Sequence, residues 1–267
     1  MERTKWTVPK AAFFALVASA LGYAAMANDT VALYTQSVST PAYDNNGNLL
    51  GYGGEFTAIT GNYSSSSSTS LLTGLGYVSA TISSAGGEYG FDTFCLQQTV
   101  DVNAGLPANY YSLSKTGGFS PDGPVTAGVA YLYSLFATGK LTDYNYGSGR
   151  ATSSDELQDA IWILQGEPVY DSHGNLLNTS SDPFLQDVIT QFSSLSAAEA
   201  AATPGEFGVG VMLLTSGDSG TGTALQDQLI LLPGGQGSGS VPDGGATICL
   251  LGLAFGGIFL HRRQSVA

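Results

Sequence analysis

The spacing of apolar residues changes twice along this 267-residue chain, and that change limits the folds available to it. Residues 30–113 and 207–232 carry short runs rich in Tyr, Val, Ile, Phe and Thr between turn-forming residues, a composition that favours strands. Residues 125–192 instead repeat apolar side chains every three to four positions, as amphipathic helices do. We therefore predict one α+β domain with an antiparallel, β-rich sandwich or barrel and an inserted block of three to four helices.

Runs of strand-forming residues and two turn signals define the β part of the domain. The expected strands are residues 30–39, 55–63, 76–83, 89–100, 110–113, 207–214 and 226–232, the last two forming a closing hairpin. Residues 43–50 and 170–177 share the pattern Tyr-Asp-x-x-Gly-Asn-Leu-Leu, which predicts two hairpin turns of one design. A calcium loop at Asp44 is the weaker interpretation, because the later carboxylate ligand of an EF-hand is missing, and we predict no metal and no cofactor. The serine-rich residues 64–70 suggest a loop tip.

Capping signals set the boundaries of the expected helices. The predicted segments are residues 125–138 with a stop at Gly139, a helix from Ser153 or Ser154 to Gly166 with Ser153 and Glu156 as a capping box, a helix from Asp182-Pro183 to about Phe192, and a short turn capped by Ser196 and Glu199 and closed by Pro204. All of these segments lie between the two groups of strands, so they form the inserted helical block.

The N-terminus looks like a segment that is removed after export. Basic residues at positions 3, 5 and 10 precede an apolar run at 11–20, and Ala25-Met26-Ala27 supplies the small-x-small site at which signal peptidases cut, with Ala25 and Ala27 as the small residues. We therefore predict a signal peptide over residues 1–27. A membrane anchor is the alternative, but the apolar run is short. The exported domain then spans residues 28–232, followed by a Gly/Ser linker at 233–240.

The C-terminus has three parts in a fixed order. They are the breaker-rich motif Val241, Pro242, Asp243, Gly244 and Gly245, an uncharged apolar run over 246–260 that would form a membrane helix, and the basic pair Arg262 and Arg263. A simple membrane anchor would explain the last two parts. The whole arrangement resembles the PEP-CTERM sorting tail of Gram-negative, exopolysaccharide-producing bacteria, in a Val-Pro-Asp-Gly-Gly variant over 241–267. That resemblance implies export through the inner membrane, transient anchoring, removal of the tail by an exosortase-type enzyme, and delivery to the cell surface or extracellular matrix.

Charge and residue types exclude several classes of function. Of eight basic residues only Lys115, Lys140 and Arg150 lie between the end segments, where 19 of the 21 acidic residues also lie, so nucleic acid is not an expected partner. The exported domain has one histidine, His173, in a predicted turn, which leaves neither a nucleophile–base pair nor zinc-ligand spacing. We therefore do not predict an enzyme. An isopeptide bond from Lys115 or Lys140 has no support in the spacing.

Cys95 is the one cysteine of the exported domain, since Cys249 lies in the tail. Exported proteins usually pair their cysteines, so a single one needs an explanation. A buried free thiol and an intermolecular disulfide are two possibilities. A third comes from the sequences Phe94-Cys95-Leu96 and Leu157-Gln158-Asp159-Ala160-Ile161-Trp162. The second sequence also suits a packed helix face, and in that interpretation Gln158 would be only a polar residue at its edge.

Together these two motifs, over about residues 89–166, resemble the thioester domains of bacterial surface adhesins. The resemblance implies an internal thioester between Cys95 and Gln158, shielded from water by Trp162 and Phe94. Such a bond would acylate an amine or hydroxyl on a partner, for instance on a surface protein or an exopolysaccharide. The expected function is thus covalent adhesion at the cell surface or in the matrix. The alternative is a non-covalent structural or polysaccharide-binding matrix protein without a thioester.

Overall fold

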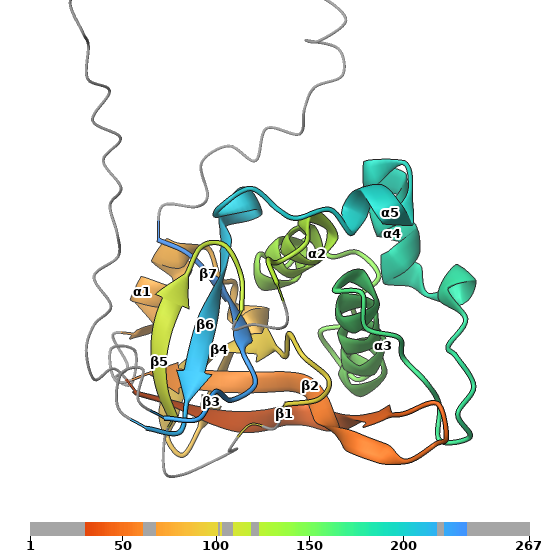
Figure 1. Ribbon diagram of the computed structural model, residues 1–267. Coiled ribbons are helices and arrows are strands. Elements are labelled where there is room, and N and C mark those ends of the chain that lie inside the picture. Colours follow the sequence, from red (N-terminus) through yellow and green to blue (C-terminus); the bar gives the residue numbers. More distant parts are fainter. Residues whose placement is uncertain are drawn as a thin grey trace, which may run out of the picture.

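A computed structural model describes residues 30–60, 68–100, 102, 109–118, 123–217 and 222–233 of the chain. Its seven strands form one antiparallel sheet in the order β3-β4-β2-β1-β5-β6-β7 (Figure 1). The strands are β1 (Thr30–Tyr43), β2 (Leu49–Thr60), β3 (Ile82–Ala85), β4 (Glu88–Phe94), β5 (Asn109–Ser114), β6 (Val209–Thr215) and β7 (Gln228–Leu231). The antiparallel, strand-rich class predicted from the sequence is confirmed, and so is the closing hairpin, which is β6 with β7.

The sheet curls until β7 returns to β4. Cys95, the residue after β4, pairs with Gln228 of β7 in an isolated antiparallel bridge. Nearby, the Thr93 hydroxyl donates to the Leu229 carbonyl (2.6 Å) and the Leu96 N–H donates to the Asp227 carbonyl (3.0 Å). Of the two predicted shapes, the described strands therefore adopt the barrel-like one, because one curled sheet stands in place of two stacked sheets.

Five α-helices accompany the sheet in the described part of the chain: α1 (Ser68–Leu75), α2 (Ala127–Ala137), α3 (Arg150–Leu164), α4 (Pro183–Phe192) and α5 (Leu195–Ala198). Two start and stop signals act as predicted. The Asp182 side chain caps α4 by accepting from the Leu185 N–H (3.0 Å), and Gly139 follows α2 with a left-handed φ of 68°. Helix α3 lies over strands β1 and β2, whereas α2 lies beside α3 and near strands β6 and β7 (Figure 1).

Several predicted boundaries of helices and strands are wrong. Residues 68–70, expected in a loop, begin helix α1, and the strand expected over 76–83 starts only at Ile82. Helix α3 begins at Arg150, so the predicted Ser153–Glu156 capping box is not used, and the Ser153 hydroxyl instead accepts from the Asn145 N–H (3.1 Å). Helix α5 is capped by Ser194 in place of Ser196.

Strand boundaries also differ from the prediction. Strand β1 runs on to Tyr43 and β2 begins at Leu49, because the turn between them is tight and both arms stay paired. Strand β4 ends at Phe94, although the strand was expected to continue to residue 100. Beyond Phe94 the backbone leaves β2 and pairs instead with the segment before β7, where the Leu96 N–H donates to the Asp227 carbonyl.

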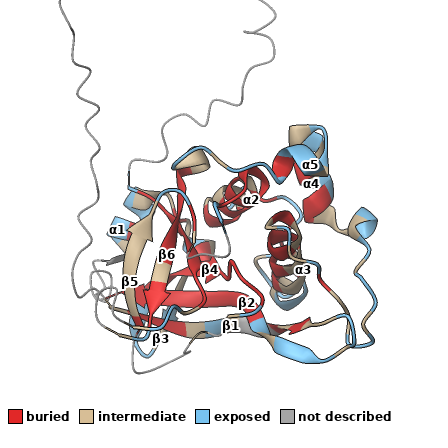
Figure 2. Ribbon diagram, in the orientation of Figure 1, coloured by how far each residue is buried: buried red, intermediate tan, exposed pale blue. Residues whose placement is uncertain are grey.

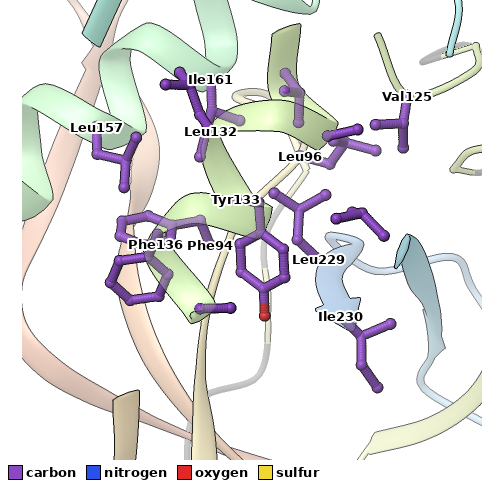
Figure 3. Close-up of a cluster of buried hydrophobic side chains, with 14 of the residues drawn as sticks. Phe94, Leu96, Val125, Leu132, Tyr133, Phe136, Leu157, Ile161, Leu229 and Ile230 are labelled. Carbon is purple, nitrogen blue, oxygen red and sulfur yellow. The ribbon is translucent and has the colours of Figure 1, made fainter. Parts of the chain in front are cut away.

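The main core lies between α2, α3 and the curled sheet. In Figure 3 the α2 residue Phe136 lies against Phe94, Leu132 lies near Ile161 of α3, and Tyr133 lies between Phe94 and Leu229 of β7. Ile230 of β7 belongs to the same core cluster. These side chains are at most 4 % exposed. Figure 2 shows that the burial follows the inner face of the sheet and the facing sides of both helices. Burial of so many aliphatic and aromatic groups is the main source of stability for the domain.

The two predicted hairpin turns are confirmed, and they pack against each other. In each turn an aspartate accepts backbone N–H groups, as Asp44 does from residues 46 and 48 (both 2.8 Å). Tyr43 pairs with Tyr170 in an isolated antiparallel bridge, which joins the bases of the two turns. Gly47 and Gly174 have left-handed φ angles of 76° and 77°, and a Cβ on either would lie 2.6 Å from a backbone oxygen of the other turn. Glycine is therefore required at both positions for two reasons: the backbone is left-handed, and a side chain would collide with the other turn.

The predicted signal peptide at residues 1–27, most of the linker and the sorting tail at 241–267 lie outside the described residues. Among the helices that are described, none combines the length and the apolar character that a bilayer span requires.

Candidate functional site

Cys95 lies at the end of β4, where the curled sheet closes. Its side chain is fully buried between the core residues Phe94 and Leu96. It is the free cysteine of the described residues, and Cys249 falls outside them. Phe94 turns into the core and packs edge-on against Phe136, with ring centroids 5.0 Å apart. The shielding role suggested for Phe94 stays a prediction.

Helix α3 presents a stripe of side chains to strand β2. Ser154, Gln158 and Trp162 are spaced four residues apart and so lie on one helix face. The Ser154 hydroxyl accepts from the Glu55 N–H (3.2 Å), one turn before the point where Gln158 meets the same strand. All three side chains of the stripe are largely or fully buried. Gln158 and Trp162 of the predicted helix motif, together with Ser154, therefore dock α3 onto the sheet.

The carboxamide of Gln158 is held between β2 and the end of β4. Its Oε1 atom accepts from the backbone N–H groups of Gly54 (2.9 Å) and Cys95 (3.0 Å). Its Nε2 atom donates to the carbonyl of Cys95 (2.8 Å). The two residues are 63 positions apart in the chain, and the fold brings them into direct contact. Two N–H groups on one carbonyl oxygen polarise the carbonyl and favour negative charge on that oxygen.

Glycine at position 53 permits this close approach. A Cβ there would lie 2.4 Å from Cζ2 of Trp162 and 3.2 Å from Cδ of Gln158. Trp162 covers this spot with its ring fully buried, and packs on its other side with Ala42 and Val169. Trp162 and Gln158 therefore lie on the same helix face, as predicted. Phe94, the second predicted shielding residue, belongs to the main core cluster and not to the cluster of Trp162.

The sulfur of Cys95 contacts two glutamines that lie outside both predicted motifs. The thiol donates to Oε1 of Gln226 (2.9 Å), and Nε2 of Gln228 donates to the sulfur (3.3 Å). Both glutamines are fully buried. Burial raises the pKa of the Cys95 thiol to about 12, while the Gln228 side chain and the Gly54 N–H act in the opposite direction. The sequence signal that could have pointed to these two glutamines is the polar run Gln-Asp-Gln at 226–228, which directly precedes the apolar residues of the buried strand β7.

A buried ion cluster holds the start of α3. Arg150 donates to Glu55 through Nε (3.0 Å to Oε2) and to Asp92 through Nη2 (2.6 Å to Oδ2). The Tyr144 hydroxyl donates to the same Glu55 carboxylate (2.8 Å). Both carboxylates are fully buried, and the guanidinium is the one cationic side chain in the described residues that bridges them. The cluster ties the helix that carries Gln158 to the strands that carry Gly54 and Cys95.

Buried carboxyl groups predict that the domain is more stable in mild acid. Burial raises the pKa of Asp159 to about 7 and of Asp182 to about 6, and it raises the pKa of Asp92 as well. Above about pH 4 and up to its raised pKa, each of these groups binds a proton in the folded state but not in the unfolded state, so stability is expected to fall as pH rises through this range. We expect a loss on the order of 1 kcal/mol per pH unit in urea denaturation over this range.

A substitution tests the origin of that slope. Asp159→Asn should flatten the pH dependence, because one Asp159 oxygen is buried and has no hydrogen-bond partner among the described residues. The pKa values of Asp44 and Asp171 are lowered by their turn hydrogen bonds, and both groups are ionised above pH 5 in either state, so they add no slope there. Stability that rose with pH between 4 and 7 would contradict the assignment.

Neither paired turn offers a metal site. His173 lies on the tip of the second turn with its side chain 80 % exposed. The Asp44 carboxylate already accepts from the turn itself, including Nδ2 of Asn48 (2.9 Å). In the part of the chain that the structure describes, no group of three or more His, Cys, Asp and Glu side chains is placed to hold a metal ion.

Comparison with known proteins addresses the C-terminus. A family model described as the VPDSG-CTERM motif matches residues 240–265, with Gly244 at the serine position of that motif. The chain thus carries a PEP-CTERM-like sorting tail, as predicted, and this tail indicates an exported surface protein that an exosortase-type enzyme processes. Searches of curated proteins and of solved structures return no match to this chain.

Proposed function

We propose that this surface protein attaches covalently to a partner through a thioester between Cys95 and Gln158. The observation that carries the proposal is the position of the Gln158 oxygen, which accepts both the Gly54 and the Cys95 N–H. Acyl transfer places negative charge on that oxygen, and a pair of fixed backbone donors is the arrangement that stabilises it. Gln158 also belongs to the helix motif Leu157–Trp162 on which the resemblance to thioester domains rests.

The bond would form without a cofactor. The Cys95 sulfur attacks Cδ of Gln158, the C–N bond breaks, and the thiol proton leaves with the amide nitrogen as ammonia. The reacting groups, together with Trp162, are fully buried. Burial keeps water away from the thioester, so it would persist until a stronger nucleophile arrives. An amine or hydroxyl on the partner would then take the acyl group of Gln158, and the Cys95 thiol would be released.

The intact mass of the purified protein tests the proposal. The protein is prepared without reducing agent or amines in a Cys249→Ala background, so that Cys95 is its one thiol. We expect a mass lower than the encoded mass by one ammonia. Methylamine should then add one molecule per chain, because it opens the thioester to form an amide. Peptide mapping should place the methylamide on Gln158.

Two variants serve as controls for this measurement. Cys95→Ala and Gln158→Leu should both show the full encoded mass and no methylamine uptake. A native protein of full encoded mass, with Cys95 open to alkylation after unfolding, would refute covalent attachment by this route. The sorting tail and surface location would be unaffected by that result.

An exposed apolar group supports a second candidate, a non-covalent matrix or polysaccharide-binding protein. Leu49, Leu50 and Tyr52 at the start of β2, and Leu176 in the second turn, are between 42 and 63 % exposed. Tyrosine and leucine side chains of this kind can pack on sugar rings. Binding to exopolysaccharide that survives in Cys95→Ala and is lost in Tyr52→Ser would favour this candidate over covalent capture.

A further inference from the structure

A surface pocket lies beside the end of α3, and none of the residues described around the Cys95 sulfur lines it. Its volume is about 390 Å³, which is within the range of pockets that hold small molecules. The apolar part of its lining consists of Ile163, Pro168, Val169, Leu176 and Leu177. Leu176 is 63 % exposed, so the pocket is open to solvent along this side. All five of these side chains are aliphatic, which suits a flexible hydrocarbon chain.

The two arms of the second paired turn form the apolar wall of this pocket. The Leu177 N–H donates to the Val169 carbonyl (2.9 Å), and Tyr170 pairs with Leu176 in an isolated bridge. Val169 also packs against the buried ring of Trp162. In Figure 1 this segment runs from the end of α3 to the paired turns and returns toward α4. Backbone hydrogen bonds and a core contact therefore fix the wall, as expected of a pocket that is formed before its ligand arrives.

Two glutamates from different parts of the chain complete the lining. The carboxylate of Glu167 is oriented by the backbone, because its Oε2 atom accepts from the Gln98 N–H (2.8 Å). Glu199 follows α5, in a segment that is held on the start of α2 by the bond from the Ala127 N–H to the Ala200 carbonyl (2.9 Å). Among the described residues that line the pocket there is no lysine, arginine or histidine. The pocket thus combines an aliphatic wall with two acidic groups.

We propose that this pocket binds an aliphatic polyamine, a methylene chain that carries at least two ammonium groups. The chain covers the aliphatic wall, and each of two ammonium groups pairs with one glutamate, Glu167 or Glu199. The hydroxyl of Thr179, which also lines the pocket, can accept a further N–H. Binding is reversible and uses neither Cys95 nor Gln158. The inference therefore goes beyond the proposed function and does not depend on it.

Charge and lining argue against other classes of ligand. A carboxylate or phosphate would meet two glutamates without a cation to offset them. A neutral apolar molecule would take water away from both carboxylates and give them no partner. A sugar ring would find few hydrogen-bonding groups on a wall of leucine, isoleucine, valine and proline. The exported domain as a whole, with 19 acidic and three basic residues, attracts cations to its surface.

Titration with small amines tests the proposal. The protein carries Cys95→Ala and Cys249→Ala, so that no amine can be captured covalently. We expect putrescine, a diamine, to bind with a dissociation constant of about 0.1–1 mM, measured by the shifts of amide NMR signals. Butylamine has the same chain length and one charge less, and should bind about tenfold more weakly. Butanol, without a charge, should give no saturable shift. The shifting signals should belong to residues 163–179 and to Glu199.

Variants of the two glutamates separate recognition of charge from simple filling of the cavity. In Glu167→Gln and in Glu199→Gln we expect the affinity for putrescine to fall about fivefold to tenfold, to near that of butylamine, because one of the two ion pairs is lost. The Glu167→Gln side chain keeps an oxygen that can accept the Gln98 N–H. Glu88→Gln, at the exposed start of β4, is the matched control and should bind putrescine like the parent protein.

Each result decides the proposal independently of the thioester. Equal affinities for putrescine, butylamine and butanol would overturn it, and so would putrescine affinities in Glu167→Gln and Glu199→Gln that match Glu88→Gln. If Glu167→Gln does not fold, Glu199→Gln decides alone, since the Glu199 side chain is exposed. The intact mass of the native protein answers the separate question of covalent attachment, because a chain without the ammonia loss would still bind putrescine in this pocket.

Discussion

Replacing Arg150 with methionine is expected to destabilise the domain by about 3–5 kcal/mol. The guanidinium bridges Glu55 and Asp92, whose side chains are fully buried, and its loss would leave two carboxylates facing each other without a cation. A domain of this size has a total stability of about 5–15 kcal/mol, so the variant should be close to unfolding. Urea denaturation at pH 7 gives the difference directly.

The pH and a second substitution test the cause of this loss. At pH 5 the penalty should shrink, because burial already raises the pKa of Asp92 and a protonated carboxyl needs no cation. Adding Asp92→Asn to Arg150→Met should recover part of the stability for the same reason. Lys140→Met is the control, since Lys140 is exposed and its loss should change stability by less than about 0.5 kcal/mol. An Arg150→Met loss below about 1 kcal/mol would show that the cluster does not hold α3.

Replacing Gly53 with alanine is expected to destabilise the domain by about 1–3 kcal/mol and to disturb the contact between α3 and β2. The new methyl group would lie 2.4 Å from the Trp162 ring, which is fully buried and packed against Ala42 and Val169. Trp162 or the strand must move, and Gln158 lies on the same helix face. If the proposed thioester exists, the variant should therefore also lose much of its ammonia-loss signal.

A matched glycine and a compensating variant make this prediction specific. Gly74→Ala, in exposed helix α1, places its methyl group within 4 Å of nothing and should be neutral or slightly stabilising. Gly53→Ala combined with Trp162→Leu should be less destabilised than the sum of the two single variants, because the smaller side chain makes room. Full native stability and native mass in Gly53→Ala would contradict the packing described for this strand.

The sequence was most informative where chemistry is local. The hairpin turns at residues 43–50 and 170–177 follow from Asp, Asn and Gly alone, and the start of α4 follows from Asp182 before Pro183. Two predicted caps were wrong: the N-cap position of α3 is Gly149 in place of Ser153, and that of α5 is Ser194 in place of Ser196.

The candidate site combines local and distant information. Cys95 and Gln158 were predicted from two short motifs, and their contact depends on the docking of α3 across β2. Gln226 and Gln228 were not predicted, because a buried glutamine in a strand has no periodic or motif signal and becomes interpretable only when its partner is known.

The amino-acid sequence by itself determined the sorting tail, the two paired turns and the start of α4, because such signals are read from residues that are neighbours in the chain. Only the tertiary structure decided what lies against the Cys95 thiol. Residues 54, 95, 158, 226 and 228 meet through sheet closure and helix docking, and such contacts depend on the packing of the whole core rather than on any local pattern.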